Sequence, residues 1–291
     1  YTTEPKQEGQ RRVMLNRVAQ QGVVGVAYKS PPASSKDMAP MIVVVSIMSS
    51  GKNSRFYKQI TDKGMVTSIS ASPSKFKYEG LFEIYASLTP GVKHEDVERA
   101  IIEELEKIKK DGVNEKETEK AKTKLTTARL FSQDGSYAVA GGLNEAIASG
   151  DWTLYTTYEE KINKVTAEDV KRVANKYILN QMSTVGYFIP ESPGESEKGT
   201  NGAAAHRHHN GPYMLKEENK EMASAFTNNV VASEPTKGVF LYTLKRGSGV
   251  VTLSGSMLGG SNYAEKKQMI PSLVVSMLDQ GTKSKSKFEI S

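Results

Sequence analysis

The order of strand-like and helix-like runs along this chain constrains its fold more than any other feature of the sequence. Runs of β-branched and aromatic residues predict strands at 13–18, 23–28, 65–71, 81–88 and 184–189. An apolar helix is expected over 37–49, and helical spacing fills most of 95–177. This pattern predicts an α+β fold in two layers, with helices packed on one face of a mainly antiparallel sheet.

The long helical region carries clear boundary signals. Residues 95–110 predict an amphipathic helix that stops at Gly112. Asn114 followed by Glu117 predicts the start of a helix that continues to about residue 131. Further helices are expected over 137–149 and 154–163, and Thr166 is expected to cap the last one.

Composition excludes several classes of function. The 291 residues include no cysteine, so thiol catalysis, disulfides and cysteine-based zinc sites are excluded, while bacterial periplasm and cytoplasm stay equally compatible. No apolar run approaches the roughly 20 residues that span a bilayer. The net charge of +6 is dispersed among acidic residues, which disfavours a nucleic-acid partner. The first residue is Tyr1 and not Met, which suggests that the chain is a piece of a longer protein.

The remaining third of the chain changes character at residue 191. Residues 191–222 are rich in Gly, Pro, Ser, Glu and Asn and show no periodicity, so a linker or long surface loop is expected. A hairpin is then predicted from 239–245 and 250–258, followed by a final helix. That helix carries apolar residues at helical spacing, and Gly281 is expected to end it as its C′ residue. The apolar residues are Ile270, Leu273, Val274 and Met277.

Five short motifs point to one known family. The chain opens with Glu-Pro-x-Gln-x-Gly-x-Arg-Arg-Val over 4–13, followed by Ala-Tyr-x-x-Pro over 27–31, and Met-Leu-x-x-Gly-Thr stands at 277–282. Together with Gly-x-x-Ser-Arg-Phe-Tyr at 51–57 and Val-Thr-x-Glu-Asp-Val at 165–170, these residues resemble the insulinase/pitrilysin-type zinc metallopeptidases, the inverzincins. The resemblance covers nearly everything outside the linker.

The resemblance implies a domain organisation. Residues 1–190 would be an insulinase-like second domain of one half of the parent protein, without a metal site. Residues 191–222 would link the halves. Residues 223–291 would be an incomplete insulinase-like domain, a partial second copy of a related fold, with a degenerate metal motif.

The family's metal motif, His-x-x-Glu-His, falls on residues 272–276. Those positions hold Ser272, Val275 and Ser276 where the family has its two histidines and its catalytic glutamate. The resemblance implies that the parent protein uses zinc. Serine is a rare zinc ligand, so this fragment is expected to hold none. No catalytic residue is therefore assigned to this piece.

The family also holds the substrate backbone with an arginine and a tyrosine. Alignment on Lys63 and Gly64 places Ile60 and Thr67 at those two positions, so both groups are missing and the substrate-binding residues stay unknown. A segment that lacks both the zinc ligands and this pair implies a zinc-bearing half that precedes Tyr1 and a substrate-holding half that follows Ser291.

The resemblance thus implies a zinc metalloendopeptidase that degrades peptides inside a clamshell chamber. This piece would supply chamber wall and the hinge between halves, and would itself be inactive. Its partners would be peptide substrates and the remaining domains, with a homo-oligomer left open. The alternative is a non-catalytic relative with a structural or peptide-binding role. A third hypothesis is that His206, His208 and His209 form a metal site; the alternative is that they belong to an exposed polar segment. His94 is interpreted as a surface or helix-cap residue.

Overall fold

A computed structural model describes residues 7–191, 230–237, 239–244, 270–277 and 280–290. The chain divides into two compact units, one formed by 1–196 with 257–291 and the other by 197–256. The three-part division at 190 and 222 remains a prediction.

The first unit is built on a five-stranded sheet in the order β1-β5-β2-β4-β3. The strands are β1 (Arg11–Val18), β2 (Val23–Ser30), β3 (Val66–Pro73), β4 (Gly80–Leu88) and β5 (Thr184–Glu191). β1 pairs with β5 in parallel, and every other pair in this sheet is antiparallel. The mainly antiparallel sheet predicted from the strand pattern is confirmed. The last strand inserts between the first two, and this arrangement makes β1 an edge strand.

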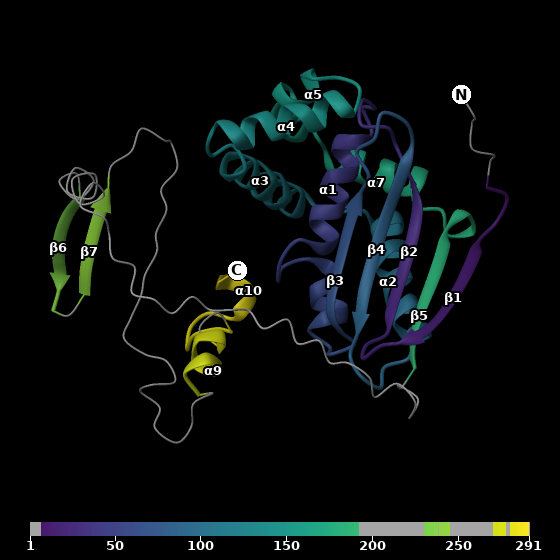
Figure 1. Ribbon diagram of the computed structural model, residues 1–291, viewed down its shortest axis with the longest axis horizontal. Helices are drawn as coiled ribbons and strands as arrows, with labels where there is room; N and C mark the ends of the chain where they lie inside the picture. The colour runs from purple at the N-terminus through teal and green to yellow at the C-terminus, as the bar shows by residue number, and fades with distance from the viewer. Residues whose placement is uncertain (1–6, 192–229, 238, 245–269, 278–279, 291) are drawn as a thin grey trace, which may run out of the picture. The chain divides into compact units, whose positions relative to one another are not determined.

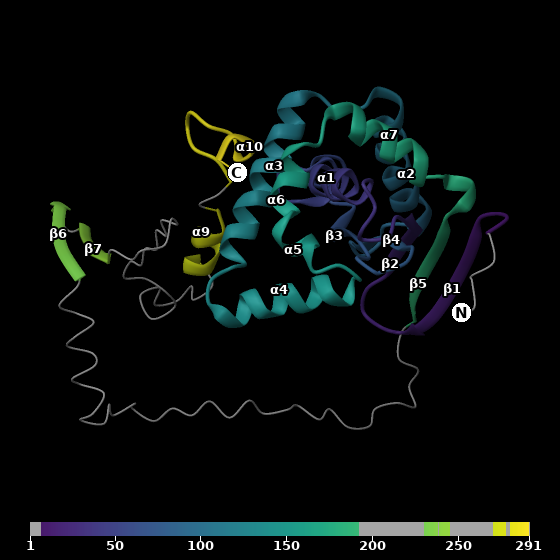
Figure 2. The ribbon, with the colours of Figure 1, turned by 90° about the horizontal axis from the view of Figure 1, so that it is seen from above.

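Helices lie on one face of this sheet. They are α1 (Met38–Ser49), α2 (His94–Asp111), α3 (Glu115–Phe131), α4 (Ser136–Ala148), α5 (Thr153–Thr156), α6 (Tyr158–Asn163) and α7 (Ala167–Tyr177). A π-helix spans Tyr57–Thr61, and a 3₁₀ helix spans Asn180–Met182. Figures 1 and 2 show α1, α2 and α7 packed together against the same side of the strands. The α+β class with helices on one face is therefore confirmed.

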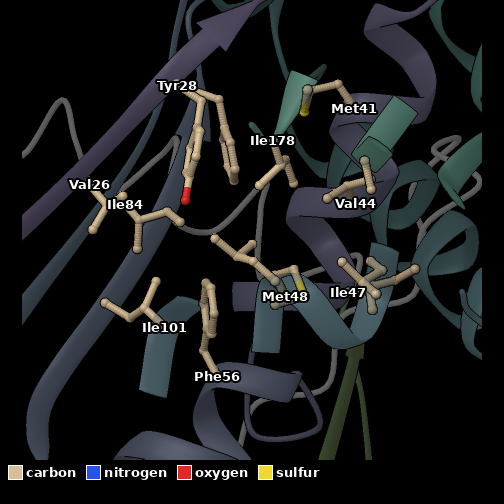
Figure 3. Close-up of a cluster of buried hydrophobic side chains, with 14 of the residues drawn as sticks. Val26, Tyr28, Met41, Val44, Ile47, Met48, Phe56, Ile84, Ile101 and Ile178 are labelled. Atoms are coloured by element: carbon tan, nitrogen blue, oxygen red, sulfur yellow. The ribbon is translucent and has the colours of Figure 1, made fainter. Parts of the chain in front are cut away.

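The hydrophobic core fills the space between that helical layer and the sheet. Alternate residues of β2 and β4 are buried, which is the pattern of strands that turn one face to a core. Tyr28 stacks on Phe82 with ring centroids 6.0 Å apart. Figure 3 shows side chains from β2, β4 and the helices meeting there, including Tyr28, Met48 and Ile178.

Predicted capping residues lie where they were expected. The Asn114 side chain accepts a hydrogen bond from the Glu117 amide, and Thr166 and Asp169 form a reciprocal capping box at the start of α7. The helix predicted over 154–163 is wrong as one element, because it is divided into α5 and α6 at Thr157. The Thr157 hydroxyl donates to the Thr153 carbonyl at 2.8 Å, and such side-chain bonds compete with the helical backbone ladder.

The second unit contains β6 (Val230–Thr236), which pairs antiparallel with β7 (Val239–Leu244). The sequence pattern did not predict β6, since Ser233, Glu234 and Pro235 interrupt its run of β-forming residues. The expected partner of β7, residues 250–258, lies outside the described residues. So does the predicted linker 191–222, apart from Glu191, which ends β5.

Two helices are described near the end of the chain, α9 (Ile270–Met277) and α10 (Lys287–Ile290). The described part of α9 ends at Met277, and residues 278 and 279, where the predicted helix end falls, lie outside the described residues. Gly281 adopts φ +133° and forms an isolated bridge with Ser286. Within the described parts of the chain, no helix has the length and apolar character needed to cross a membrane.

Candidate functional site

Residues 272–276, the positions predicted to correspond to the family's metal motif, lie on α9. The Ser276 hydroxyl is exposed and donates to the Leu273 carbonyl at 2.8 Å, so its hydrogen goes to the helix backbone. The side chains of Ser272 and Val275 are outside the described set. Among the residues that the structure describes, no group of three or more His, Asp or Glu side chains is placed to hold a metal ion.

The positions aligned with the family's substrate-holding pair face different environments. Ile60 is fully buried in the hydrophobic core. Thr67 is exposed on β3, where its hydroxyl accepts a hydrogen bond from Gln21 at 2.6 Å. The structure therefore does not bring these two side chains together on one surface.

His94 begins α2 and faces the sheet. Its Nε2 atom lies 2.9 Å from the Phe188 carbonyl oxygen, and its ring centroid lies 5.2 Å from that of Tyr187. This contact assigns His94 to packing of the helix on β5. The other three histidines, His206, His208 and His209, lie outside the described residues.

A buried carboxylate joins the edge strand β1 to α2. Arg12 donates to both carboxylate oxygens of Glu98, at 2.9 and 2.5 Å, and the Tyr187 hydroxyl donates to the same group. Burial opposes the charge of Glu98, but the bonds from Arg12 and Tyr187 outweigh it and lower the pKa of Glu98. Burial and the bond to Glu98 raise the pKa of Tyr187 to about 12. Sequence reasoning missed this cluster, because nothing local connects residues 86 positions apart.

The sheet face opposite the helices is an open surface. Gly25 of β2 stands in register with Gly186 of β5 and with Tyr85 of β4. A Cβ atom at Gly25 would lie 3.4 Å from the Tyr85 ring, so the glycine lets this ring lie close to the strand. Tyr85 is 52% exposed, and Val13 on β1 is 58% exposed. We name this surface, formed by the outward residues of β1, β5, β2 and β4, the open sheet face.

The open sheet face ends at an unpaired strand edge. All eight residues of β1 are exposed, and β1 has β5 as its only partner in the described sheet. Alternate amide and carbonyl groups of an edge strand point away from the sheet and can accept an added extended chain. The described surface can therefore bind a chain through backbone hydrogen bonds and apolar contacts.

Comparisons with known proteins identify relatives of this chain. Residues 1–125 match the family described as "Peptidase M16 inactive domain". The zinc protease PqqE of Helicobacter pylori is 28% identical over 195 residues, covering 65% of this chain and 43% of that protein. The mitochondrial-processing peptidase subunit beta of Lentinula edodes is 28% identical over 175 residues, covering 57% of this chain and 37% of that protein. The chain thus spans less than half the length of these relatives.

Solved structures share the fold. The crystal structure of a protease from Helicobacter pylori superposes with a TM-score of 0.62 at 26% identity, covering 65% of this chain and 46% of that one. An inactive peptidase domain from Bordetella parapertussis superposes with a TM-score of 0.57 at 24% identity, covering 64% of this chain and 99% of that one.

The first unit has the mixed α/β fold of these peptidase domains. Residues 1–125 match the peptidase M16 inactive domain, and the predicted insulinase/pitrilysin resemblance is confirmed.

Proposed function

We propose that this chain is the non-catalytic middle part of a zinc metalloendopeptidase, and that its open sheet face forms wall of the chamber that holds peptide substrates. The observation that carries this proposal is the sheet itself: one face packs on helices, while the other presents half-buried and exposed residues. Two of its relatives are named as zinc protease and processing peptidase, which supports peptides as the substrate class.

The zinc site of the parent is proposed to lie outside this chain. In this proposal α9 is the degenerate counterpart of the metal-binding helix, with Ser272, Val275 and Ser276 at the motif positions. Ile60 and Thr67 stand where a substrate-holding half would carry its arginine and tyrosine. Residues 191–222 are proposed to be the hinge between halves.

Activity of the isolated chain tests the first part of this proposal. We expect the 291-residue protein to leave a fluorogenic peptide library uncleaved with or without added zinc, and the gene to encode His-x-x-Glu-His upstream of Tyr1. Zinc-dependent cleavage by the chain alone would overturn the proposal. An upstream region without the motif would favour the alternative of a non-catalytic, structural or peptide-binding relative.

The chamber-wall role is tested in the parent protein. Ala27 is half-buried on the open sheet face, so Ala27→Tyr should narrow the space for substrate and lower kcat/KM several-fold. Glu168→Tyr, on the exposed side of α7, is the matched control and should leave kcat/KM unchanged. Equal effects of the two substitutions would argue against a substrate-facing sheet.

A further inference from the structure

A groove on the helical side of the first unit has no part in the proposed chamber wall. It has a volume of about 450 Å³ and lies between α1, α3, α4 and the short helices α5 and α6. Volumes of about 300–1,000 Å³ with mostly apolar walls are typical of small-molecule sites. Its apolar lining includes Met38, Ile42, Leu125, Leu154 and Ile162.

Three cationic side chains, Lys75, Arg129 and Lys161, line this groove against one carboxylate, Glu145. Within the described residues none of the three cations forms an ion pair. Lys75 and Arg129 are close enough to influence each other: desolvation first, and then the charge of Arg129, lowers the pKa of Lys75, while Glu145 acts in the opposite direction. An apolar groove with unneutralised positive charge matches a ligand that carries an anionic group on an apolar body.

The Arg129 guanidinium is held in place by aromatic rings. It lies 3.9 Å from the ring centroid of Tyr155 and 5.6 Å from that of Tyr158, and it donates to the Tyr155 carbonyl at 3.0 Å. A guanidinium has five N–H groups, so donors remain for a further acceptor. Gly142 makes room for this arrangement, because a Cβ atom there would lie 2.5 Å from the Tyr155 ring.

Lys75 is positioned by its backbone. The Ser149 hydroxyl donates to the Lys75 carbonyl at 2.7 Å, which fixes the loop that follows β3 onto the end of α4. The Lys75 ammonium lies 5.9 Å from the Tyr158 ring centroid. Both cations therefore lie near the Tyr158 ring, at one part of an otherwise aliphatic groove.

We propose that this groove binds a monocarboxylate with an unbranched apolar body, of the fatty-acid class, with its carboxylate between Lys75 and Arg129. The alkyl chain would lie against the aliphatic residues of α1, α3 and α6. A carboxylate can accept two N–H groups of a guanidinium side by side, and such charge-assisted bonds are stronger than neutral ones.

Binding can be measured with decanoate as the probe on the full chain. The protein has a single tryptophan, Trp152, two residues before Leu154 of the groove, so its fluorescence reports occupancy alongside titration calorimetry. We expect saturable binding of decanoate. Decanol, which lacks the charge, should bind with an affinity lower by roughly tenfold or more.

Two variants locate the site. Lys75→Gln combined with Arg129→Gln should weaken decanoate binding roughly tenfold or more, while Lys77→Gln, a neighbouring lysine outside the groove lining, should not. Ala128→Phe places a ring into the groove from an exposed position of α3 and should also abolish binding, whereas Ala140→Phe on α4 should not.

Four results would overturn the proposal. They are the absence of saturable decanoate binding, equal affinity for decanol, affinity unchanged by the groove variants, and a dimer in sedimentation that Ala128→Phe dissociates. The last result would show that a second copy of the chain occupies the groove. None of these outcomes depends on whether the parent protein is a peptidase.

Discussion

Asp37 is a buried carboxylate surrounded by three donors. Its side chain is 2% exposed and pairs with Arg172 and Lys176, each at 2.7 Å, while the Tyr177 hydroxyl donates at 3.0 Å. Burial disfavours the charge of Asp37, but these three bonds outweigh burial and lower its pKa to about 2. The carboxylate therefore joins the start of α1 to α7.

Replacing Asp37 by asparagine should lower the free energy of unfolding by about 1–3 kcal/mol. The amide keeps the shape but removes the charge, and the partial exposure of Arg172 and Lys176 limits the loss. Urea unfolding at pH 7 measures it, with Asp134→Asn at an exposed position as the control. A change no larger than that of the control would contradict the role given to Asp37.

The same contact has a defined pH dependence. Because the folded pKa of about 2 lies below the ordinary value of 3.8, the stabilisation is fully present above pH 3.8 and is lost as the pH falls toward 2. The difference in unfolding free energy between the wild type and Asp37→Asn should therefore be constant near neutral pH and shrink below about pH 4. A difference that stays constant down to pH 2 would contradict this assignment.

At the scale of elements, β1 is an edge strand of the described sheet. It pairs with β5 on one side only, and its bidentate bond from Arg12 to Glu98 is its ion pair with the helical layer. Glu98 is buried and would keep only the Tyr187 hydroxyl if Arg12 were removed. Loss of this arginine should therefore loosen β1 more than it destabilises the core.

Arg12→Gln should speed amide hydrogen exchange in residues 11–18 roughly tenfold and leave residues 23–30 of β2 nearly unchanged. Arg17→Gln on the same strand is the control, since residue 17 points to the open sheet face. Exchange measured by mass spectrometry on peptides from both strands distinguishes the two variants. Uniform acceleration in β1 and β2 would mean that Arg12 supports the whole domain instead.

At the scale of the molecule, the described hydrophobic core is contained in one continuous segment. Its buried members run from Val24 to Tyr187, and the partly buried residues that pack on it end at Ile189. A domain with its own core can fold by itself. The shortened chain 1–191 should therefore unfold cooperatively, with a midpoint within a few degrees of that of the full chain. A broad or absent transition in calorimetry would show that later residues are needed.

Sequence periodicity predicted most individual elements but not their partners. The alternation in 23–28 and 81–88 predicted two strands with one buried face, and Asn114 and Thr166 predicted two helix starts, because these signals depend on neighbouring residues. The parallel pairing of Arg11–Val18 with Thr184–Glu191 has no local signal, since the two strands are far apart in the chain. Glu98 likewise gives no sign, within the helix pattern, that it is buried.

The motifs by themselves indicated the family resemblance and the absence of His-x-x-Glu-His at 272–276, and the order of strand-like and helix-like runs predicted the mainly antiparallel α+β class. The tertiary structure decided which face of the sheet stays open, that Ile60 is core while Thr67 is surface, and that Lys75 meets Arg129 in one groove. The physical reason is the distance along the chain over which each kind of information acts. Side-chain periodicity and motif spacing act over a few residues, whereas burial, charge pairing and concave surfaces arise only when distant segments pack together.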